Sequence, residues 1–363
     1  MTDSELAELV AQLLTIVDDY AVLPMSTDHV HRWLAQFPAD TRVPVLAALV
    51  PTLTRTYFSR KRIEAVVRAL AATGLDPAVA PAHFWSTVGG LELGVPGHSQ
   101  EYLYALLRAE VGRQHGIELA SGSGGEFLLL DDHLFSGTCA VETLRDWLLD
   151  PRVDQRRVHL VFLAAHSFGL ARAHRALSRA AADAGKDVRL CWWHELRIED
   201  HPRSGRSDVL RPLRPPPAGA PARWPAMDLG PADQPALADV FLAAGQEIKQ
   251  SIVDPAFYVR PLGYQGIDSF GFGTTVMTYR GCPNHAPLAL WFGDPGGRAG
   301  PPWDVWYPLL PRPMARQRLE LRGLPERFFA YDDDLALVPP PVSRPLASLA
   351  ARAPRTPPRA GDP

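Results

Sequence analysis

The feature that most constrains this chain lies in residues 126–193, where short apolar runs alternate with helical patterns. The runs at 127–130, 158–165 and 188–193 are typical of strands that are covered on both faces. Residues 140–148 and 169–184, which separate these runs, carry apolar side chains at helical spacing. Strands that alternate with helices pair in parallel through right-handed crossovers. The sequence therefore predicts an α/β core with a parallel sheet and helices on both faces.

Helices are also predicted ahead of this core. A cap cluster opens a helix over 27–37 that stops at Pro38, a second apolar pattern spans 43–58, and Ser59 caps a third segment. We interpret these helices as an N-terminal cap that packs on the following domain. A nucleic-acid adaptor is the alternative, although Arg60-Lys61-Arg62 is the only basic cluster there.

The expected organisation follows chain order. Seven prolines between Pro202 and Pro225 indicate a loop or linker, and a helix is expected over 236–252 with one strand at 274–279. The end of the chain carries Pro and Arg without apolar faces, which predicts disorder. The expected segments are a helical cap (1–80), the α/β core (81–200), the proline-rich loop (201–233), a block rich in Gly, Pro and aromatics (234–337) and a disordered tail (338–363).

Charge and composition exclude several classes of protein. A net charge of −3 argues against attraction of the whole chain to nucleic acid or anionic lipid. No apolar stretch is long enough to span a bilayer, and the acidic N-terminus differs from a signal peptide, so a cytoplasmic location is expected. The three cysteines are far apart, which indicates free thiols. None of the three lysines completes a P-loop motif, which excludes a P-loop nucleotidase.

The candidate site lies where the first strand ends. The apolar run 127–130 leads into Asp131 and Asp132, and the turn Ser136-Gly137-Thr138 then opens a helix. Ligands of open α/β sheets bind at the carboxyl ends of the strands. Backbone amides at such a turn, next to the positive end of a helix, suit a phosphate. Two carboxylates one sugar-length away suit the vicinal hydroxyls of a ribose.

Each of these signals has a structural alternative. The acid pair could cap the next helix and otherwise be solvated. Cys282 and His285 could form half of a zinc site, although an incidental turn is favoured because no second pair has ligand spacing. The aromatic residues of the 291–307 block could stack on a base or form a local core, and the local core is favoured.

The segment 128–139 resembles the phosphoribosyl pyrophosphate (PRPP) motif of type I phosphoribosyltransferases, in which an apolar strand precedes two acids and a Ser/Thr-Gly turn. A narrower resemblance runs from about residue 27 to 313 and is to the PRTase-CE family, which is associated with prokaryotic conflict and anti-phage systems. The matching motifs are Trp33-Leu34-Ala35-Gln36-Phe37, Gly97-His98-Ser99, Leu262-Gly263-Tyr264, Cys282-Pro283-Asn284-His285-Ala286-Pro287, Trp291 and the run 306–312.

The resemblance implies a type I phosphoribosyltransferase-like fold and a role for each motif residue. Asp131 and Asp132 would contact the ribose hydroxyls and stabilise an oxocarbenium-like state. Mg²⁺ would be held mainly by the ligand's diphosphate, with no metal site built by the protein, and the 234–337 block would form a base-binding hood. The 5′-phosphate would be held by Ser136, Gly137, Thr138 and Cys139, and the pyrophosphate by Gly97, His98 and Ser99.

The function implied by this resemblance is binding of PRPP or a phosphoribosyl nucleotide, with turnover in a prokaryotic defence system. Other defence-system proteins are the expected partners. Two alternatives from other classes stay open, which are a non-catalytic nucleotide sensor and a nucleic-acid adaptor that works through the N-terminal helices.

Overall fold

The structure of the protein, a computed structural model, describes residues 3–90, 99–119, 126–150, 157–201, 206–210, 234–252, 259–264, 270–313 and 341–350. The contacts divide the chain into two compact units, each of which is built from two stretches that are far apart in the sequence. The first unit combines residues 1–62 with 198–338, and the second combines 63–197 with 339–363. The sequence-based division followed chain order, whereas each of these units contains both an early and a late part of the chain.

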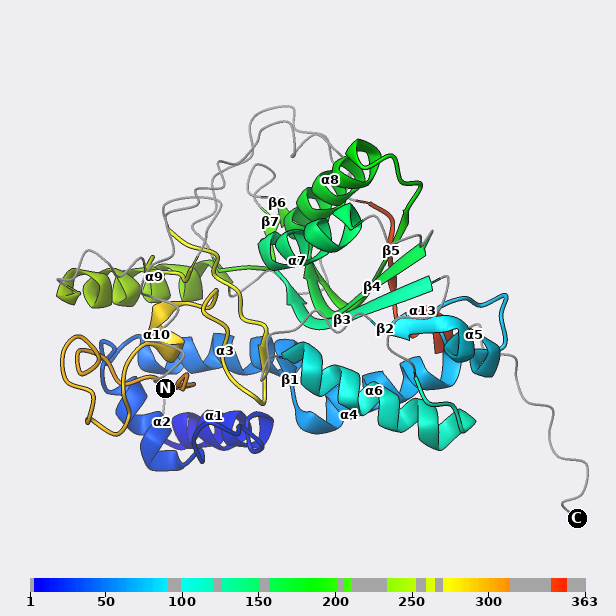
Figure 1. Ribbon diagram of the computed structural model, residues 1–363. Helices are drawn as coiled ribbons and strands as arrows, with labels where there is room; N and C mark the ends of the chain where they lie inside the picture. Colours follow the sequence, from blue (N-terminus) through cyan, green and yellow to red (C-terminus); the bar gives the residue numbers. More distant parts are fainter. Residues whose placement is uncertain are drawn as a thin grey trace, which may run out of the picture. The chain divides into compact units, whose positions relative to one another are not determined.

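The second unit contains the predicted parallel sheet (Figure 1). Its strand order is β2-β3-β4-β5-β9, and the pairs β2–β3, β3–β4 and β5–β9 are parallel. These strands are β2 (Val88–Gly90), β3 (Glu126–Leu134), β4 (Arg157–His166), β5 (Arg189–Ile198) and β9 (Ser343–Pro345).

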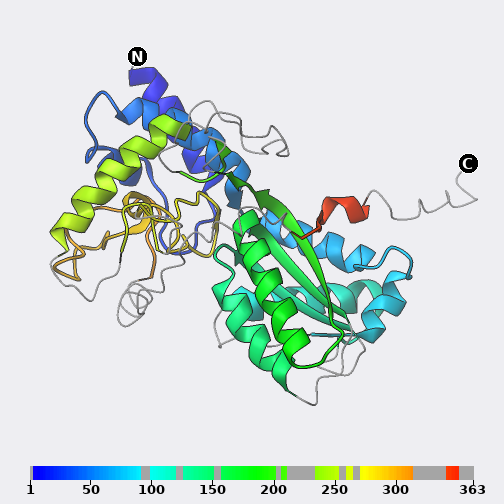
Figure 2. The same cartoon turned by 90° about the horizontal axis from the view of Figure 1, so that it is seen from above.

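Helices cover both faces of this sheet, as the sequence predicted (Figures 1 and 2). One face carries α7 (Thr138–Leu149) and α8 (Ser167–Asp183), and α6 (Ser99–His115) packs on β3 from the other face. Alternation along β3 and β4 sends Phe127, Leu129, Leu160 and Phe162 into one buried cluster with α7 and α8. The fold is therefore the α/β architecture expected of a type I phosphoribosyltransferase-like domain.

The end of the chain corrects one expectation. Residues 343–350 were predicted to be disordered, but they form β9 on the edge of the sheet and the short helix α13 (Ala347–Ala350). The Leu346 amide donates to the His194 carbonyl oxygen (2.8 Å), and Leu346 and Leu349 are buried. The prediction failed because an edge strand needs only a backbone partner and a few apolar anchors, too short a signal for periodicity to detect.

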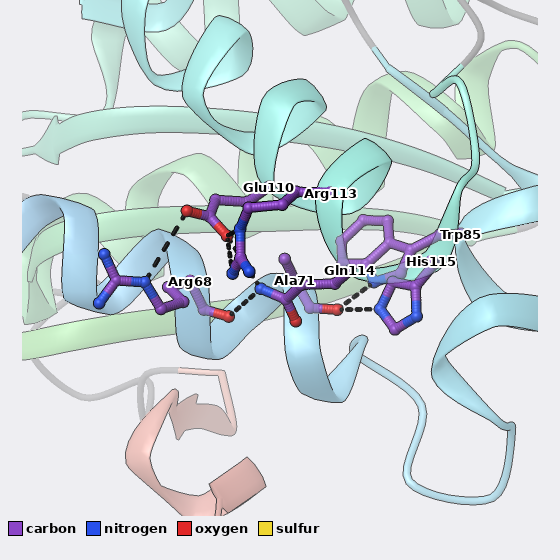
Figure 3. Close-up of polar contacts among 7 residues, drawn as sticks. All are labelled: Arg68, Ala71, Trp85, Glu110, Arg113, Gln114 and His115. Atoms are coloured by element: carbon purple, nitrogen blue, oxygen red, sulfur yellow. Dashed lines mark hydrogen bonds and ion pairs between the residues drawn. The ribbon is translucent and has the colours of Figure 1, made fainter.

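Polar contacts fix the C-terminal half of α6 against α4 (Arg60–Thr73) and α5 (Pro81–Thr87) (Figure 3). The Ala71 carbonyl oxygen at the end of α4 lies 2.7 Å from Trp85 Nε1 and 2.8 Å from His115 Nε2. Gln114 donates to the Arg68 carbonyl oxygen (3.2 Å), and Glu110 pairs with Arg113 (2.7 Å). These contacts orient α6, whose N-terminus reaches β3.

The first unit is built from helices and a loop-rich block. In it α1 packs on α3, and both α3 and α10 pack on α9, while β1 pairs with β8 in parallel and β6 with β7 in antiparallel. Ser59 Oγ accepts from the Arg62 amide (3.2 Å), so the predicted cap at the start of α4 is present. The elements are α1 (Asp3–Ile16), α2 (Thr27–Leu34), α3 (Arg42–Thr56), β1 (Tyr57–Phe58), β6 (Asp200–His201), β7 (Arg206–Ser207), α9 (Gln234–Ser251), β8 (Met277–Thr278) and α10 (Leu288–Trp291).

Aromatic residues of the C-terminal block form the core of this unit. Trp291 and Trp306 are 1% and 6% exposed, so neither presents a ring face to a ligand. Their indole nitrogens donate to the carbonyl oxygens of Ala286 and Ala289 (2.7 and 2.9 Å), and Trp33 Nε1 also donates to Ala289 (2.8 Å). Trp291 and Trp306 are therefore part of a local core, as the sequence favoured, and do not stack on a base.

One predicted strand is shorter than expected, and one predicted loop lies mostly outside the described residues. The strand expected at 274–279 contracts to the two residues of β8, because β1 offers only two residues to pair with. Most of the proline-rich segment 201–233 lies outside the described residues, apart from β7 and the residues up to Leu210. In the described part of the chain, no helix is long and apolar enough to cross a membrane.

Candidate functional site

The two acids lie within β3 rather than after it. The strand continues past the apolar run to Leu134, and Asp131 still pairs with Phe162 of β4. Both strands end at the same edge of the sheet, where Leu134 pairs with Ala165. The carboxylates therefore sit on a rigid strand at the carboxyl edge, where ligands of parallel sheets bind.

Asp131 is held by three hydrogen bonds. Its Oδ1 accepts from Ser99 Oγ (2.8 Å) and from the Asp132 amide (2.8 Å), and its Oδ2 accepts from Gln100 Nε2 (2.8 Å). Because an ionised carboxylate offers about four acceptor positions, most of the capacity of Asp131 is already used. Gln100 Oε1 is buried and has no hydrogen-bond partner among the described residues.

The two carboxyl groups differ in their tendency to ionise. Burial and the neighbouring Asp132 carboxylate raise the pKa of Asp131 to about 7, despite the three donors that favour its charged form. Burial acts in the same direction on Asp132, but His133, whose Nδ1 lies 3.3 Å from Oδ1, lowers the pKa of Asp132 below its ordinary value. The Asp132 side chain is 27% exposed. Asp132 is therefore the ionised carboxylate that a ligand can reach.

The turn after β3 leads directly into α7. Gly137 is the N-cap residue, with a left-handed backbone (φ 74°) that favours glycine. The Val141 amide makes the first helical bond, to the Gly137 carbonyl oxygen (3.0 Å). The amides of Cys139 and Ala140 consequently lie at the open, positive end of the helix, whereas the Thr138 amide donates to Ser136 Oγ (3.4 Å).

Neither acid caps this helix in the described structure. The N-cap residue is Gly137, which has no side chain, and Asp131 accepts its side-chain hydrogen bonds from Ser99 and Gln100 at the start of α6. The structural alternative, in which the acid pair caps the following helix, is therefore not what the fold shows.

The first turn of α8 packs directly on this turn. A Cβ on Gly137 would lie 2.7 Å from the Gly169 carbonyl oxygen, and a Cβ on Gly169 would lie 2.1 Å from the Phe135 carbonyl oxygen. Both distances are shorter than a Cβ contact allows, so only glycine fits at either position. Arg172, one helical turn beyond Gly169, donates from Nη1 to the Ser136 carbonyl oxygen (2.8 Å) and to Thr138 Oγ1 (2.9 Å).

Sequence reasoning missed Gln100, Gly169 and Arg172. Gln100 directly follows the Gly97-His98-Ser99 motif, which was a signal to examine it. A glycine in the first turn of a predicted helix that directly follows a strand indicates close approach of another backbone. Arg172 had no such signal, because its role depends on the neighbouring turn.

The hydrogen bonds place the predicted site residues that the structure describes in two groups. Asp131, Asp132 and Ser99 form one cluster, and Ser136 and Thr138 share a hydrogen bond between their hydroxyls (3.1 Å). Cys139 is exposed in the first turn of α7. Gly97 and His98 lie outside the described residues.

The alternative metal candidates gain no support. Cys282 is buried, and burial raises the pKa of its thiol to about 12. In the parts of the chain that the structure describes, no group of three or more His, Cys, Asp or Glu side chains could hold a metal ion.

Comparison with known proteins gives one match. The profile of the PRTase-CE family matches residues 30–312, which is most of the chain and includes β3, the turn at 136–138 and the tryptophan core. Neither the curated proteins nor the solved structures give a match. The extent of the family match, together with the parallel sheet and its acid-bearing strand, shows that this phosphoribosyltransferase-like chain belongs to the PRTase-CE family.

Proposed function

We propose that this chain binds PRPP or a phosphoribosyl nucleotide at the carboxyl edge of β3 and acts on it in a prokaryotic defence system. The observation that carries the proposal is the pairing of an ionised, accessible Asp132 with the open end of α7. Such a pairing offers acceptors to sugar hydroxyls and donors to a phosphate within one short segment. The defence context rests on the association of the family.

The two acids have different roles in this proposal. Asp132 accepts hydrogen bonds from the ribose hydroxyls, and its negative charge stabilises the oxocarbenium-like state of glycosyl transfer. Asp131, already bonded to Ser99 and Gln100, fixes the start of α6 beside the ribose. The buried Gln100 Oε1 is a further acceptor at the same place.

The phosphate would be held by the turn Ser136-Gly137-Thr138 and by Cys139. The amides at the start of α7 and the two hydroxyls supply neutral donors, and the helix end adds partial positive charge. We further propose that Mg²⁺ enters with the ligand's diphosphate. A hard cation such as Mg²⁺ commonly keeps most of its oxygen ligands from phosphate and water.

Calorimetric titration with PRPP and Mg²⁺ tests the proposal. Asp132→Asn keeps the shape of the side chain and removes its charge, so affinity should fall about tenfold or more, since a hydrogen bond to a charged group contributes roughly 1.5–3 kcal/mol. Asp146→Asn, at an exposed position on α7, is the matched control and should leave affinity unchanged. Unchanged affinity in Asp132→Asn would contradict the proposal.

Release of pyrophosphate from bound PRPP, measured with a panel of nucleobases, separates turnover from sensing. Product formation supports a transferase. Tight binding with no pyrophosphate release would favour the non-catalytic nucleotide sensor.

A further inference from the structure

The turn that opens α7 is shaped by a neighbouring helix as well as by its own sequence. β3 and β4 end side by side, and α8 begins at Ser167, directly after the last residue of β4. The first turn of α8 therefore lies against residues 135–137. The pair Gly137 and Gly169 permits this approach, because a side chain at either position would collide with the other segment's backbone.

Arg172 extends from this contact into the turn. Residues three apart on a helix share a face, so Arg172 lies on the same side of α8 as Gly169. Its Nη1 donates to the Ser136 carbonyl oxygen (2.8 Å) and to Thr138 Oγ1 (2.9 Å), on the two sides of Gly137. Arg172 thus brings a positive charge to the turn that opens α7.

These contacts set the direction of the hydroxyl donors. Thr138 Oγ1 accepts from Arg172 and lies 3.1 Å from Ser136 Oγ. Since Arg172 carries only donors, the hydrogen of Thr138 must point to another acceptor, either Ser136 or a ligand. A hydrogen-bonded chain that starts at a cation is polarised along its length, which strengthens its last donor toward an anion.

We propose that Arg172 is the cation of the phosphate site, which holds the turn in its anion-binding shape and makes the site select a phosphorylated sugar over the same sugar without phosphate. This inference deepens the proposed function and rests on it. The ligand class it names is a sugar phosphomonoester, which carries nearly two negative charges at neutral pH. A site with only neutral amides and hydroxyls would discriminate less between the charged and the uncharged sugar.

The test uses ribose 5-phosphate, ribose and inorganic phosphate as probes in calorimetric titrations of the full chain. Arg172→Gln removes the charge and keeps a donor, so ribose 5-phosphate should bind about tenfold to a hundredfold more weakly, as expected for loss of a charged partner. Its affinity should also depend less steeply on salt than that of the unaltered protein. Arg179→Gln, on the same helix with an 84% exposed side chain, is the matched control and should bind normally.

Arg172→Lys separates charge from shape. Lysine keeps the cation but lacks the planar fork, so affinity should lie between those of the unaltered protein and Arg172→Gln, with a salt dependence close to the former. Thermal melts of each variant check that the fold is intact. If Arg172→Gln does not fold, Arg172→Lys alone provides the test. A salt dependence of its ribose 5-phosphate affinity equal to that of the unaltered protein supports the charge role. A weaker salt dependence refutes it.

The outcomes distinguish this inference from the proposed function. Equal affinity of Arg172→Gln and the unaltered protein for ribose 5-phosphate would overturn the role of Arg172, while the Asp132→Asn experiment could still support the ribose site. If Arg172→Gln weakens ribose 5-phosphate binding and Asp132→Asn does not, the result would support the inference and contradict the proposed PRPP site. Failure of the unaltered protein to bind phosphate or ribose 5-phosphate would overturn both.

Discussion

Replacement of Gly169 by alanine tests whether close backbone contact between α8 and the turn shapes the phosphate site. A Cβ at this position would lie 2.1 Å from the Phe135 carbonyl oxygen and 2.9 Å from its carbonyl carbon. Both contacts are with backbone, which cannot rotate away as a side chain can. To restore ordinary contact, α8 and the turn must separate by roughly 1 Å in an interior that is close-packed.

The magnitude follows from two opposing effects. Alanine in a helix is favoured over glycine by about 0.5–1 kcal/mol. Overpacking of a tight interior costs about 1–3 kcal/mol. We therefore expect Gly169→Ala to lower the free energy of unfolding by a net amount of up to about 2.5 kcal/mol, and to weaken ribose 5-phosphate binding because the turn is displaced.

The chain offers a matched control for this change. Gly112 is also a helical glycine, in α6, and a Cβ there would meet only the Ile117 carbonyl oxygen at 3.7 Å, an ordinary contact. Gly112→Ala should therefore raise stability by up to about 1 kcal/mol and leave binding unchanged. Urea denaturation followed by circular dichroism compares the two variants. If Gly169→Ala proves as stable as Gly112→Ala and binds ribose 5-phosphate normally, the reasoning about this contact is wrong.

Two further predictions concern titration and the end of the chain. Asp131 has a folded-state pKa of about 7, above the ordinary value of 3.8. Between about pH 4 and pH 7 the folded state therefore holds a proton on Asp131 that the unfolded state has lost. Stability should therefore fall as pH rises from about 4 to about 7, and urea denaturation of Asp131→Asn should show a smaller fall over that window; equal slopes would contradict the assignment. Truncation after residue 340 removes β9 and the buried Leu346 and Leu349, each worth roughly 1.5–3 kcal/mol, and should lower the melting temperature by several degrees. A change below about 2 °C would show that these residues contribute little.

Local sequence determined the elements of the core and the main parts of the site. Apolar runs and helical spacing located β3, α7, β4, α8 and β5, because strand and helix periodicity are properties of neighbouring residues. The cap at Ser59 and the left-handed turn at Gly137 were also predictable, since both depend on the chemistry of one short segment. Asp131, Asp132 and the turn lie in one such segment and were found together.

The tertiary structure decided everything that depends on contact between distant segments. Gly169 and Arg172 reach the turn only because β3 and β4 end side by side, and Asp131 accepts hydrogen bonds from Ser99 and Gln100 only because the start of α6 reaches β3. The edge strand near residue 344 and the grouping of residues 1–62 with 198–338 are decided in the same way. No local pattern encodes such contacts, because their free energy comes from surfaces that meet only after the chain has folded.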